Sequence, residues 1–229
     1  MNLSLTLIDA AGAHDTSLAL HTLVVAGWTG RDADAIAHHI AELAAIGIPA
    51  PSAVPLFYRV AASLATQQAS IQVVGAGSSG EIEPVLLRAL GAWWLTLGSD
   101  HTDRDAERNG IAIAKQACAK PIARVAWRFD DVRDRLDALE LVARIAEDGA
   151  TETYQRGTLA RIRPLPGLID DMLRATGLPL RDGLAMFCGT LPAIGPIRAS
   201  SRFGGELRDP VSGRSIALDY RIDALPLVS

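Results

Sequence analysis

Residues 80–105, GEIEPVLLRALGAWWLTLGSDHTDRD, join two apolar, strand-like segments to five acidic side chains. In an extended segment alternate residues share one face, so Glu81 and Glu83 lie on the same side of a sheet. Two neighbouring carboxylates repel each other unless a cation neutralises them or both face water. The pair therefore indicates either a hard-metal site or a solvated sheet edge.

The next acid, Asp100, stands where the apolar segment AWWLTLGS ends. Polar residues at such ends often form sites. Asp100 can complete a three-acid set with Glu81 and Glu83, leaving positions open for water and substrate, as Mg²⁺ or Mn²⁺ usually requires. The alternative is that Asp100, Asp103 and Asp105 cap a helix over 104–117. That alternative suits Asp100 least, because this residue precedes the helix by several positions.

Elsewhere Gly and Pro separate short apolar segments, a pattern typical of many strands and few helices. The clearest helix spans 30–46, where Thr29 can cap the start and Gly47 can end it. Alternating apolar residues over 137–146, followed by EDG and TETYQ, predict two antiparallel strands around a turn. The segments GLAMFCGTLPAIG and SIALDYRI predict further strands near the carboxyl end. Strands are also expected at 2–8, 21–26, 54–60, 71–74 and 92–97.

His39 lies beside the apolar stripe of the first helix, with Glu42 one turn further on, at hydrogen-bonding distance. A histidine oriented by a carboxylate can take a proton near neutral pH, so His39 is the candidate base. The alternative is a structural histidine at the core boundary.

Two other segments carry polar groups that can meet an anion. Lys115 follows the apolar run GIAIA, so it either reaches an anion or keeps its ammonium in surface water. Gly189 and Thr190 present amides and a hydroxyl together, either to a carboxylate or simply within a turn. The run GAGSSG matches neither phosphate-loop pattern, and no GxSxG motif is present. Cys118 and Cys188 show no metal or disulfide spacing and are expected to be buried thiols.

The composition limits the function classes. With 229 residues, 49% of them apolar, the chain is long enough for one domain with a real core. A net charge of −4 without a dense basic run argues against nucleic-acid binding. No apolar run is long enough to span a bilayer, and a basic signal-peptide start is missing, so we expect a cytoplasmic protein. We expect one domain over 1–229, with 1–50 as a small lobe and 51–229 as the core.

In their order, these motifs resemble the fumarylacetoacetate hydrolase (FAH) superfamily, and more closely a bacterial branch of unestablished function. The resemblance covers approximately 24–226. GEIEPVLL is similar to the glutamate-x-glutamate metal strand, and SDHTDRD is similar to the D-x-T-x-R-D pattern. LRDGLAMFCGTLPAIG resembles the family's L-x-x-G-D-x-x-x-T-G-T-P-x-G-x-G motif. HIAE at 39–42 is similar to the H-x-x-E dyad.

The resemblance implies an α+β fold with a mixed β-roll core, a few peripheral helices and a homodimer. It implies a Mg²⁺- or Mn²⁺-dependent hydrolase or lyase that cleaves a C–C bond of a 2-oxo acid or 1,3-dicarbonyl compound through a metal-stabilised enolate. The implied partner is thus a small-molecule carboxylate substrate, with no nucleic acid and no membrane. The implied residues are the metal ligands Glu81, Glu83 and Asp100, the catalytic His39, Glu42 and Lys115, and the substrate contacts Arg104 and Thr190.

Some features depart from the family pattern and leave alternatives open. Arg59 replaces the usual lysine after the first Phe, GTLPAIG is looser than the family's motif, and the interval before Asp100 is short. Oxaloacetate decarboxylation, hydration and tautomerisation use the same kind of site. Two further alternatives are a non-catalytic protein that binds a small acid and a metal enzyme in which His101 is a ligand.

Overall fold

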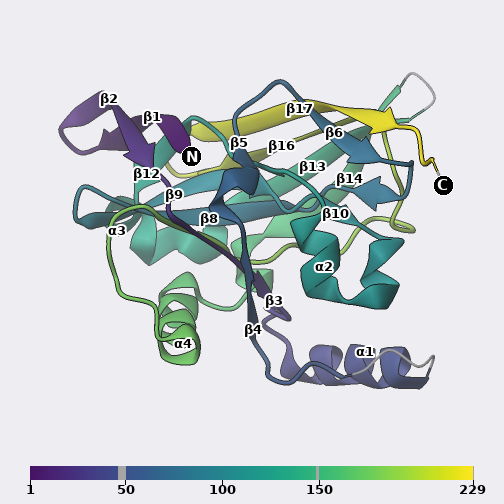
Figure 1. Cartoon of the computed structure of the whole chain (residues 1–229). Helices are drawn as coiled ribbons and strands as arrows, with labels where there is room; N and C mark the ends of the chain where they lie inside the picture. The colour runs from purple at the N-terminus through teal and green to yellow at the C-terminus, as the bar shows by residue number, and fades with distance from the viewer. Residues whose placement is uncertain (46–49, 148–149, 229) are drawn as a thin grey trace.

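A computed structural model describes residues 1–45, 50–147 and 150–228. The side chains of His39, Glu42, residues 43–45 and residue 147 lie outside this description. The described residues form two large β-sheets with a few helices at their margins (Figure 1). Both large sheets combine parallel and antiparallel pairs, which confirms the predicted α+β class with a mixed β core.

The larger sheet has eight strands. Strand pairs β1–β12 and β15–β3 are parallel, and the other neighbours are antiparallel. Of the first three strands of the chain, β1 and β3 lie inside this sheet, next to strands from the middle and the end of the chain, and β2 lies at its edge. In spatial order the strands are β2 (Gly12–Ala19), β1 (Asn2–Asp9), β12 (Val125–Arg128), β9 (Ala92–Ser99), β8 (Ile82–Ala89), β15 (Leu184–Phe187), β3 (Thr22–Gly27) and β4 (Leu56–Val60).

The second large sheet has five strands, of which only β17 and β6 pair in parallel. The predicted hairpin is confirmed, because β13 and β14 pair antiparallel with one irregularity beside Ala143. The spatial order is β14 (Ala150–Thr158), β13 (Glu140–Glu147), β16 (Arg202–Arg208), β17 (Ser215–Leu225) and β6 (Ser70–Val74). Two short ladders join β10 (Thr102–Asp103) to β7 (Ser78–Ser79) and β11 (Lys120–Pro121) to β5 (Ala65–Thr66).

The helices are short and peripheral. In Figure 1, α1 lies at the margin of the molecule, far from the five-stranded sheet, whereas α2 lies closer to the sheets. No helix among the described residues is long and apolar enough to cross a membrane. The α-helices are α1 (Ala33–Ala45), α2 (Ile111–Gln116), α3 (Phe129–Val132) and α4 (Leu165–Thr176), and the 3-10 turns are η1 (Ala62–Leu64), η2 (Ala106–Asn109), η3 (Arg133–Ala138) and η4 (Leu159–Arg161).

Three details differ from the sequence expectations. The first helix begins at Ala33, and its cap is Asp32, whose Oδ1 accepts the N–H groups of Asp34 and Ala35 at 3.0 Å. Thr29 is buried instead, next to Gly30, which forms an isolated β-bridge with Ile162. The helix expected at 104–117 is divided into η2 and α2 by Gly110, because glycine is a poor helix residue.

Helix α4 was not predicted, although its apolar side chains follow helical spacing.

The apolar core occupies both faces of the eight-stranded sheet, since alternate residues of a strand point to opposite sides. On β8, Ile82 and Leu86 belong to the cluster shared with the five-stranded sheet, and Val85 and Leu87 to the cluster on the other face. Glu83 is two and four residues before Val85 and Leu87, so its side chain lies on the same face of β8 as theirs. The acid pair is therefore at the start of β8, on that second face.

Candidate metal centre and its cavity

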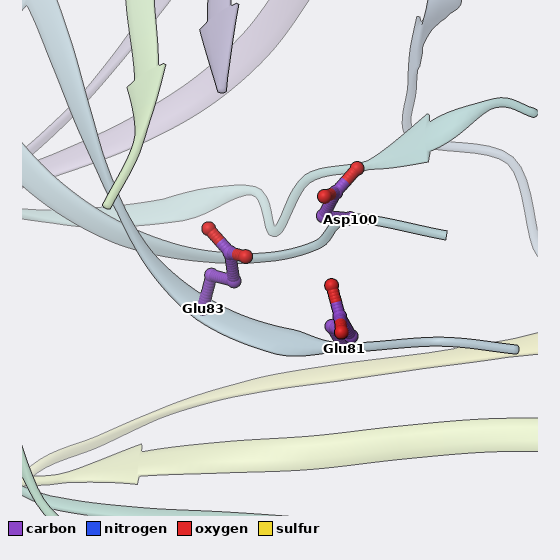
Figure 2. Close-up of side chains that lie close together, drawn as sticks. All are labelled: Glu81, Glu83 and Asp100. Carbon is purple, nitrogen blue, oxygen red and sulfur yellow. The ribbon is translucent and has the colours of Figure 1, made fainter. Parts of the chain in front are cut away.

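Three carboxylates converge where β8 begins and β9 ends. One oxygen from each of Glu81, Glu83 and Asp100 lies within 4.8 Å of the others (Figure 2). The pairing of the two strands sets this geometry, because Glu83 lies opposite Gly98 and the Asp100 N–H donates to the Glu81 carbonyl at 2.9 Å. Glu83 is 2% exposed and Asp100 is fully buried. The pair is therefore not a solvated sheet edge.

Two lysines flank the Asp100 carboxylate. The Lys115 ammonium donates to Oδ2, and the Lys120 Nζ lies 3.3 Å from Oδ1. Burial alone would raise the pKa of Asp100, but these two cations outweigh it and lower that pKa below its usual value. Lys115 is buried too, and burial opposes its charged form, but Asp100, Glu81 and Glu83 together raise its pKa. Lys115 is thus a buried cation of the acidic cluster, not a surface lysine.

Lys120 is fully buried and uses all its protons on backbone carbonyls. It donates to the carbonyl oxygens of His101, Lys115 and Cys118. An ammonium has three protons, and three carbonyls accept from Lys120, so Lys120 acts on Asp100 mainly through its charge. In agreement with this, Asp100 Oδ1 is a buried oxygen without a hydrogen-bond partner among the described residues.

The negative charge of Glu83 has fewer partners than that of Asp100. The backbone N–H of Gly189 donates to its Oε2 at 2.7 Å. Burial raises the pKa of Glu83 well above its ordinary value, and the negative charges of Asp100 and Glu81 raise it further. The cluster thus contains a buried acid whose negative charge is poorly balanced by the protein.

Glu81 is the most accessible of the three acids, with 21% of its side chain exposed. The Arg104 Nη2 lies 3.1 Å from its Oε1, and the Lys115 Nζ lies 4.0 Å from its Oε2. Arg104 also donates to Ser79 at 2.7 Å and to Glu107 at 2.8 Å. Its guanidinium is therefore held by three protein groups.

Gln155 of β14 joins the second sheet to the loop after β15. Its amide donates to Thr190 Oγ1 at 2.8 Å and to the Leu191 carbonyl, and its oxygen accepts the Ile82 N–H at 3.0 Å. The Thr190 hydroxyl in turn donates to the Ile82 carbonyl at 2.7 Å. Because its single proton is used there, the hydroxyl has only a lone pair left to offer a ligand.

A cavity of about 540 Å³ opens over Glu81 and Glu83. Its walls include Trp28, Tyr58 and Thr29, together with charged residues from η2 and α2. Trp28 has a left-handed backbone with φ of 59°, an uncommon and strained conformation for a bulky residue that is typical of functional sites. Burial raises the pKa of Tyr58, so its hydroxyl stays protonated at neutral pH.

The structure leaves one predicted pair undescribed. His39 and Glu42 belong to the backbone of α1, but their side chains lie outside the described part of the structure. Their predicted catalytic role stays a prediction. Asp103 takes the capping role considered for it, since its Oδ1 accepts the N–H groups of Asp105 and Ala106 at 3.0 Å.

His101 does not point into the acidic cluster. Its ring nitrogens pair with the Tyr220 hydroxyl and the Ser78 hydroxyl, each at 2.9 Å. Burial and the nearby cations lower the pKa of His101 to about 3, so the ring is neutral. Among the described residues, the side chains close enough together to hold a metal ion are Glu81, Glu83 and Asp100. His101 is not one of them, which disfavours it as a ligand. Both cysteines are buried free thiols, as expected.

Sequence reasoning missed Lys120, Trp28 and Tyr58. The signal available for Lys120 was weak: a single lysine directly before Pro121, in a mostly apolar segment. Lysine is rarely buried without a partner, so a buried role is not the first expectation for Lys120. Contacts between distant parts of the chain bring it close to Asp100.

The described geometry can be compared with known proteins. The model of a family described as "Protein of unknown function (DUF2848)" matches residues 26–220. Curated protein sequences give no match. Among solved structures, Cg1458 with an inhibitor has a TM-score of 0.67 at 19% identity, covering 94% of this chain and 81% of that one.

Two enzymes share the same fold. A 2-keto-3-deoxy-D-arabinonate dehydratase complexed with magnesium and 2,5-dioxopentanoate has a TM-score of 0.62 at 14% identity, covering 91% of this chain and 75% of that chain. A 5-carboxymethyl-2-hydroxymuconate delta-isomerase from Mycobacterium smegmatis has a TM-score of 0.63 at 15% identity, covering 94% and 82%. The chain therefore belongs to the DUF2848 family, which confirms the predicted branch of unestablished function, and at these identities the likeness to solved structures establishes the fold alone.

Proposed function

Because the chain belongs to the DUF2848 family of unknown function, we propose a function from the site itself: a divalent-metal-dependent enzyme acting on a 2-oxo acid or 1,3-dicarbonyl compound. The observation that carries the proposal is the convergence of Glu81, Glu83 and Asp100, the first two of which line one cavity. A protein of similar fold, the 2-keto-3-deoxy-D-arabinonate dehydratase complexed with magnesium and 2,5-dioxopentanoate, adds support.

The donor set fits Mg²⁺ or Mn²⁺. Carboxylate oxygens are the hard ligands that these ions prefer, and three such residues leave coordination positions for water and substrate. Two details of the structure favour a bound cation: Asp100 Oδ1 is buried without a hydrogen bond, and the charge of Glu83 is poorly balanced. When bound, the ion would supply positive charge next to the 2-oxo group, where negative charge develops.

The chain's own groups would then bind and orient the substrate. Lys115 stays charged beside the acids, so it can stabilise an enolate oxygen or hold a substrate carboxylate. Arg104 is held by Ser79, Glu107 and Glu81, and we propose that it positions Glu81. Thr190 can accept a hydrogen bond from a substrate. His39, oriented by Glu42, is proposed to move a proton or activate a water.

Within this class we propose hydrolytic C–C cleavage of the acylpyruvate type, which converts the substrate and one water into a carboxylic acid and a 2-oxo acid. Dehydratase and isomerase neighbours support a second candidate, hydration–dehydration or tautomerisation, at the same site. We also propose a homodimer located in the cytoplasm. These finer assignments depend on the family resemblance, not on the three carboxylates alone.

The first experiment measures the melting temperature with and without Mg²⁺ and oxalate, a mimic of an enolate. Ligand that binds the folded state raises the melting temperature. We expect Mg²⁺ to stabilise the wild type and oxalate to add stabilisation only when Mg²⁺ is present. Glu83→Ala should lose both effects, whereas Glu140→Ala, a matched change at an exposed residue of β13, should retain them. Wild-type protein that shows no Mg²⁺-linked stabilisation would favour a non-catalytic protein.

The second experiment screens acylpyruvates, oxaloacetate and related 2-oxo acids for turnover by the same three proteins. The reaction class is read from the products, since cleavage, decarboxylation and tautomerisation yield different ones. Turnover that persists at the wild-type rate in Glu83→Ala would refute the proposed mechanism.

A further inference from the structure

Three cations among the described residues line the cavity, and the protein neutralises two of them. Arg104 contacts Ser79, Glu107 and Glu81, and Lys115 contacts Asp100 and approaches Glu81. The Arg104 Nη2 makes no hydrogen bond with a described residue but lies 3.1 Å from Glu81 Oε1, so two carboxylates already balance the arginine charge. The substrate contact that the family resemblance implies for Arg104 stays a prediction.

The third cation is Arg108. It belongs to η2 and lines the same cavity as Glu81 and Glu83. Its side chain is exposed, and it makes no hydrogen bond or ion pair with any residue that the structure describes. The neighbouring acid, Glu107, is paired with Arg104 and so is not available to Arg108. Arg108 is therefore a cation at the accessible side of the cavity, without a protein counter-ion among the described residues.

Much of the cavity lining is apolar. The larger apolar and aromatic side chains of this lining are Trp28, Tyr58, Ile111 and Ile197. The cavity volume of about 540 Å³ lies in the range of small-molecule sites, about 300–1,000 Å³. A ligand that fills this cavity thus has the acids, Arg108 and apolar side chains available to it.

We propose that Arg108 binds a second carboxylate, at the end of the substrate remote from its 2-oxo group. The substrate class is then a dicarboxylic 2-oxo acid with an apolar segment between its two polar ends. The guanidinium suits this task because it can donate two parallel hydrogen bonds to a carboxylate. This inference rests on the proposed function, since the 2-oxo end of the ligand is assigned to the three acids.

The test uses acids of equal carbon number that differ only at the far end. The pairs are 2-oxoglutarate with 2-oxopentanoate, 2-oxoadipate with 2-oxohexanoate, and 2-oxopimelate with 2-oxoheptanoate. Dissociation constants are measured by calorimetry with saturating Mg²⁺ at one fixed ionic strength. The proteins are wild type, Arg108→Gln, Arg108→Lys, Glu83→Ala and Arg181→Gln, the last being a matched change at an exposed arginine outside the cavity.

For at least one chain length, the wild type should bind the dicarboxylic acid about tenfold or more tightly than its partner, the size expected for a charge-assisted hydrogen bond. Arg108→Gln should lose this preference while its affinity for the monocarboxylic acid stays within about twofold. Arg108→Lys should keep part of the preference, since it retains the charge but not the planar pair of donors. Arg181→Gln should behave as wild type.

Three results would overturn the inference, and they have different meanings. Equal affinity within every pair, with all binding lost in Glu83→Ala, would refute the role of Arg108 and leave the proposed function standing. No binding of any acid by the wild type, with or without Mg²⁺, would refute both. A dicarboxylate preference that survives in Arg108→Gln would also count against Arg108.

Discussion

The ends of β8 and β9 place two buried carboxylates side by side in opposite electrostatic surroundings. Asp100, after β9, faces Lys115 and Lys120, and these cations lower its pKa. Glu83, on β8, has the Gly189 N–H, and burial with neighbouring acids raises its pKa. The protein thus places its buried positive charge on the Asp100 side of the cluster. A divalent cation would supply what the Glu83 side lacks.

The largest effect on the free energy of unfolding is expected when Asp100, the acid beside the two lysines, is replaced by a neutral residue. Asp100→Asn leaves Lys115 and Lys120 buried without their main counter-ion. Breaking a buried ion pair by removing one partner costs about 3–5 kcal/mol. We therefore expect urea denaturation to show a loss of this size in the free energy of unfolding.

The matched control for that change is Asp223→Asn, at an exposed residue of β17, where a change below about 0.5 kcal/mol is expected. A loss of less than about 1 kcal/mol in Asp100→Asn would contradict the picture of two lysines stabilised by one carboxylate.

An intermediate effect is expected at the group that contacts Glu83. Gly189 has a φ of 97°, and a Cβ at this position would lie 1.7 Å from Thr29 Oγ1. Gly189→Ala therefore combines backbone strain with a steric clash, for a loss of about 2–3 kcal/mol. It should also weaken Mg²⁺-linked thermal stabilisation, because the Gly189 N–H orients Glu83.

Gly213→Ala separates the two costs. Gly213 has a φ of 71°, and a Cβ added there would have no atom within 4 Å. This variant should lose only about 1–2 kcal/mol, from backbone strain, and keep its response to Mg²⁺. Equal losses in the two alanine variants would mean that Thr29 yields without cost.

The smallest effect has the opposite sign. Glu83→Gln removes a poorly balanced buried charge but keeps an oxygen for the Gly189 N–H. Without metal, this variant should therefore be more stable than wild type, by on the order of 1 kcal/mol at neutral pH. With Mg²⁺ the order should reverse, since the variant has lost a ligand. A destabilised metal-free Glu83→Gln would show that Glu83 is better compensated than the contacts indicate.

The pH dependence of this difference follows from the raised pKa of Glu83. A carboxyl whose pKa is higher in the folded state binds its proton more tightly there, so acidification favours folding through this group. The advantage of metal-free Glu83→Gln over wild type should then shrink as the pH falls from about 8 toward 5. Denaturant titrations of both proteins across this range measure the difference, and other titrating groups cancel between them.

The sequence allowed the acidic cluster and most strands to be predicted, because both depend on local patterns. The two-residue spacing of Glu81 and Glu83 needs only an extended chain, and the hairpin of β13 and β14 follows from alternation around a turn. The site's counter-charges could not be found in this way. Lys120 is brought to Asp100 by the pairing of β11 with β5 and by the end of α2, which no local pattern encodes.

Two role assignments stay predictions. The family resemblance implies that Arg104 and Thr190 contact the substrate, and a motif does not reveal which hydrogen bonds these side chains already make. In the structure Arg104 is held by three protein groups, and the Thr190 proton goes to Ile82. The exposed Arg108 has no motif at all and becomes notable only when the cavity is known.

The enclosure of Lys120 bears on how the site responds to dissolved ions. At physiological ionic strength, mobile ions screen exposed charges over about 8 Å but reach buried pairs poorly. Added salt should therefore leave the attraction between Lys120 and Asp100 nearly unchanged, because both residues are fully buried. The exposed Arg108 should instead attract anions less strongly as salt increases. The electrostatic potential around Lys120 and Asp100 should therefore stay nearly constant as the ionic strength changes, whereas the potential around Arg108 should change with it.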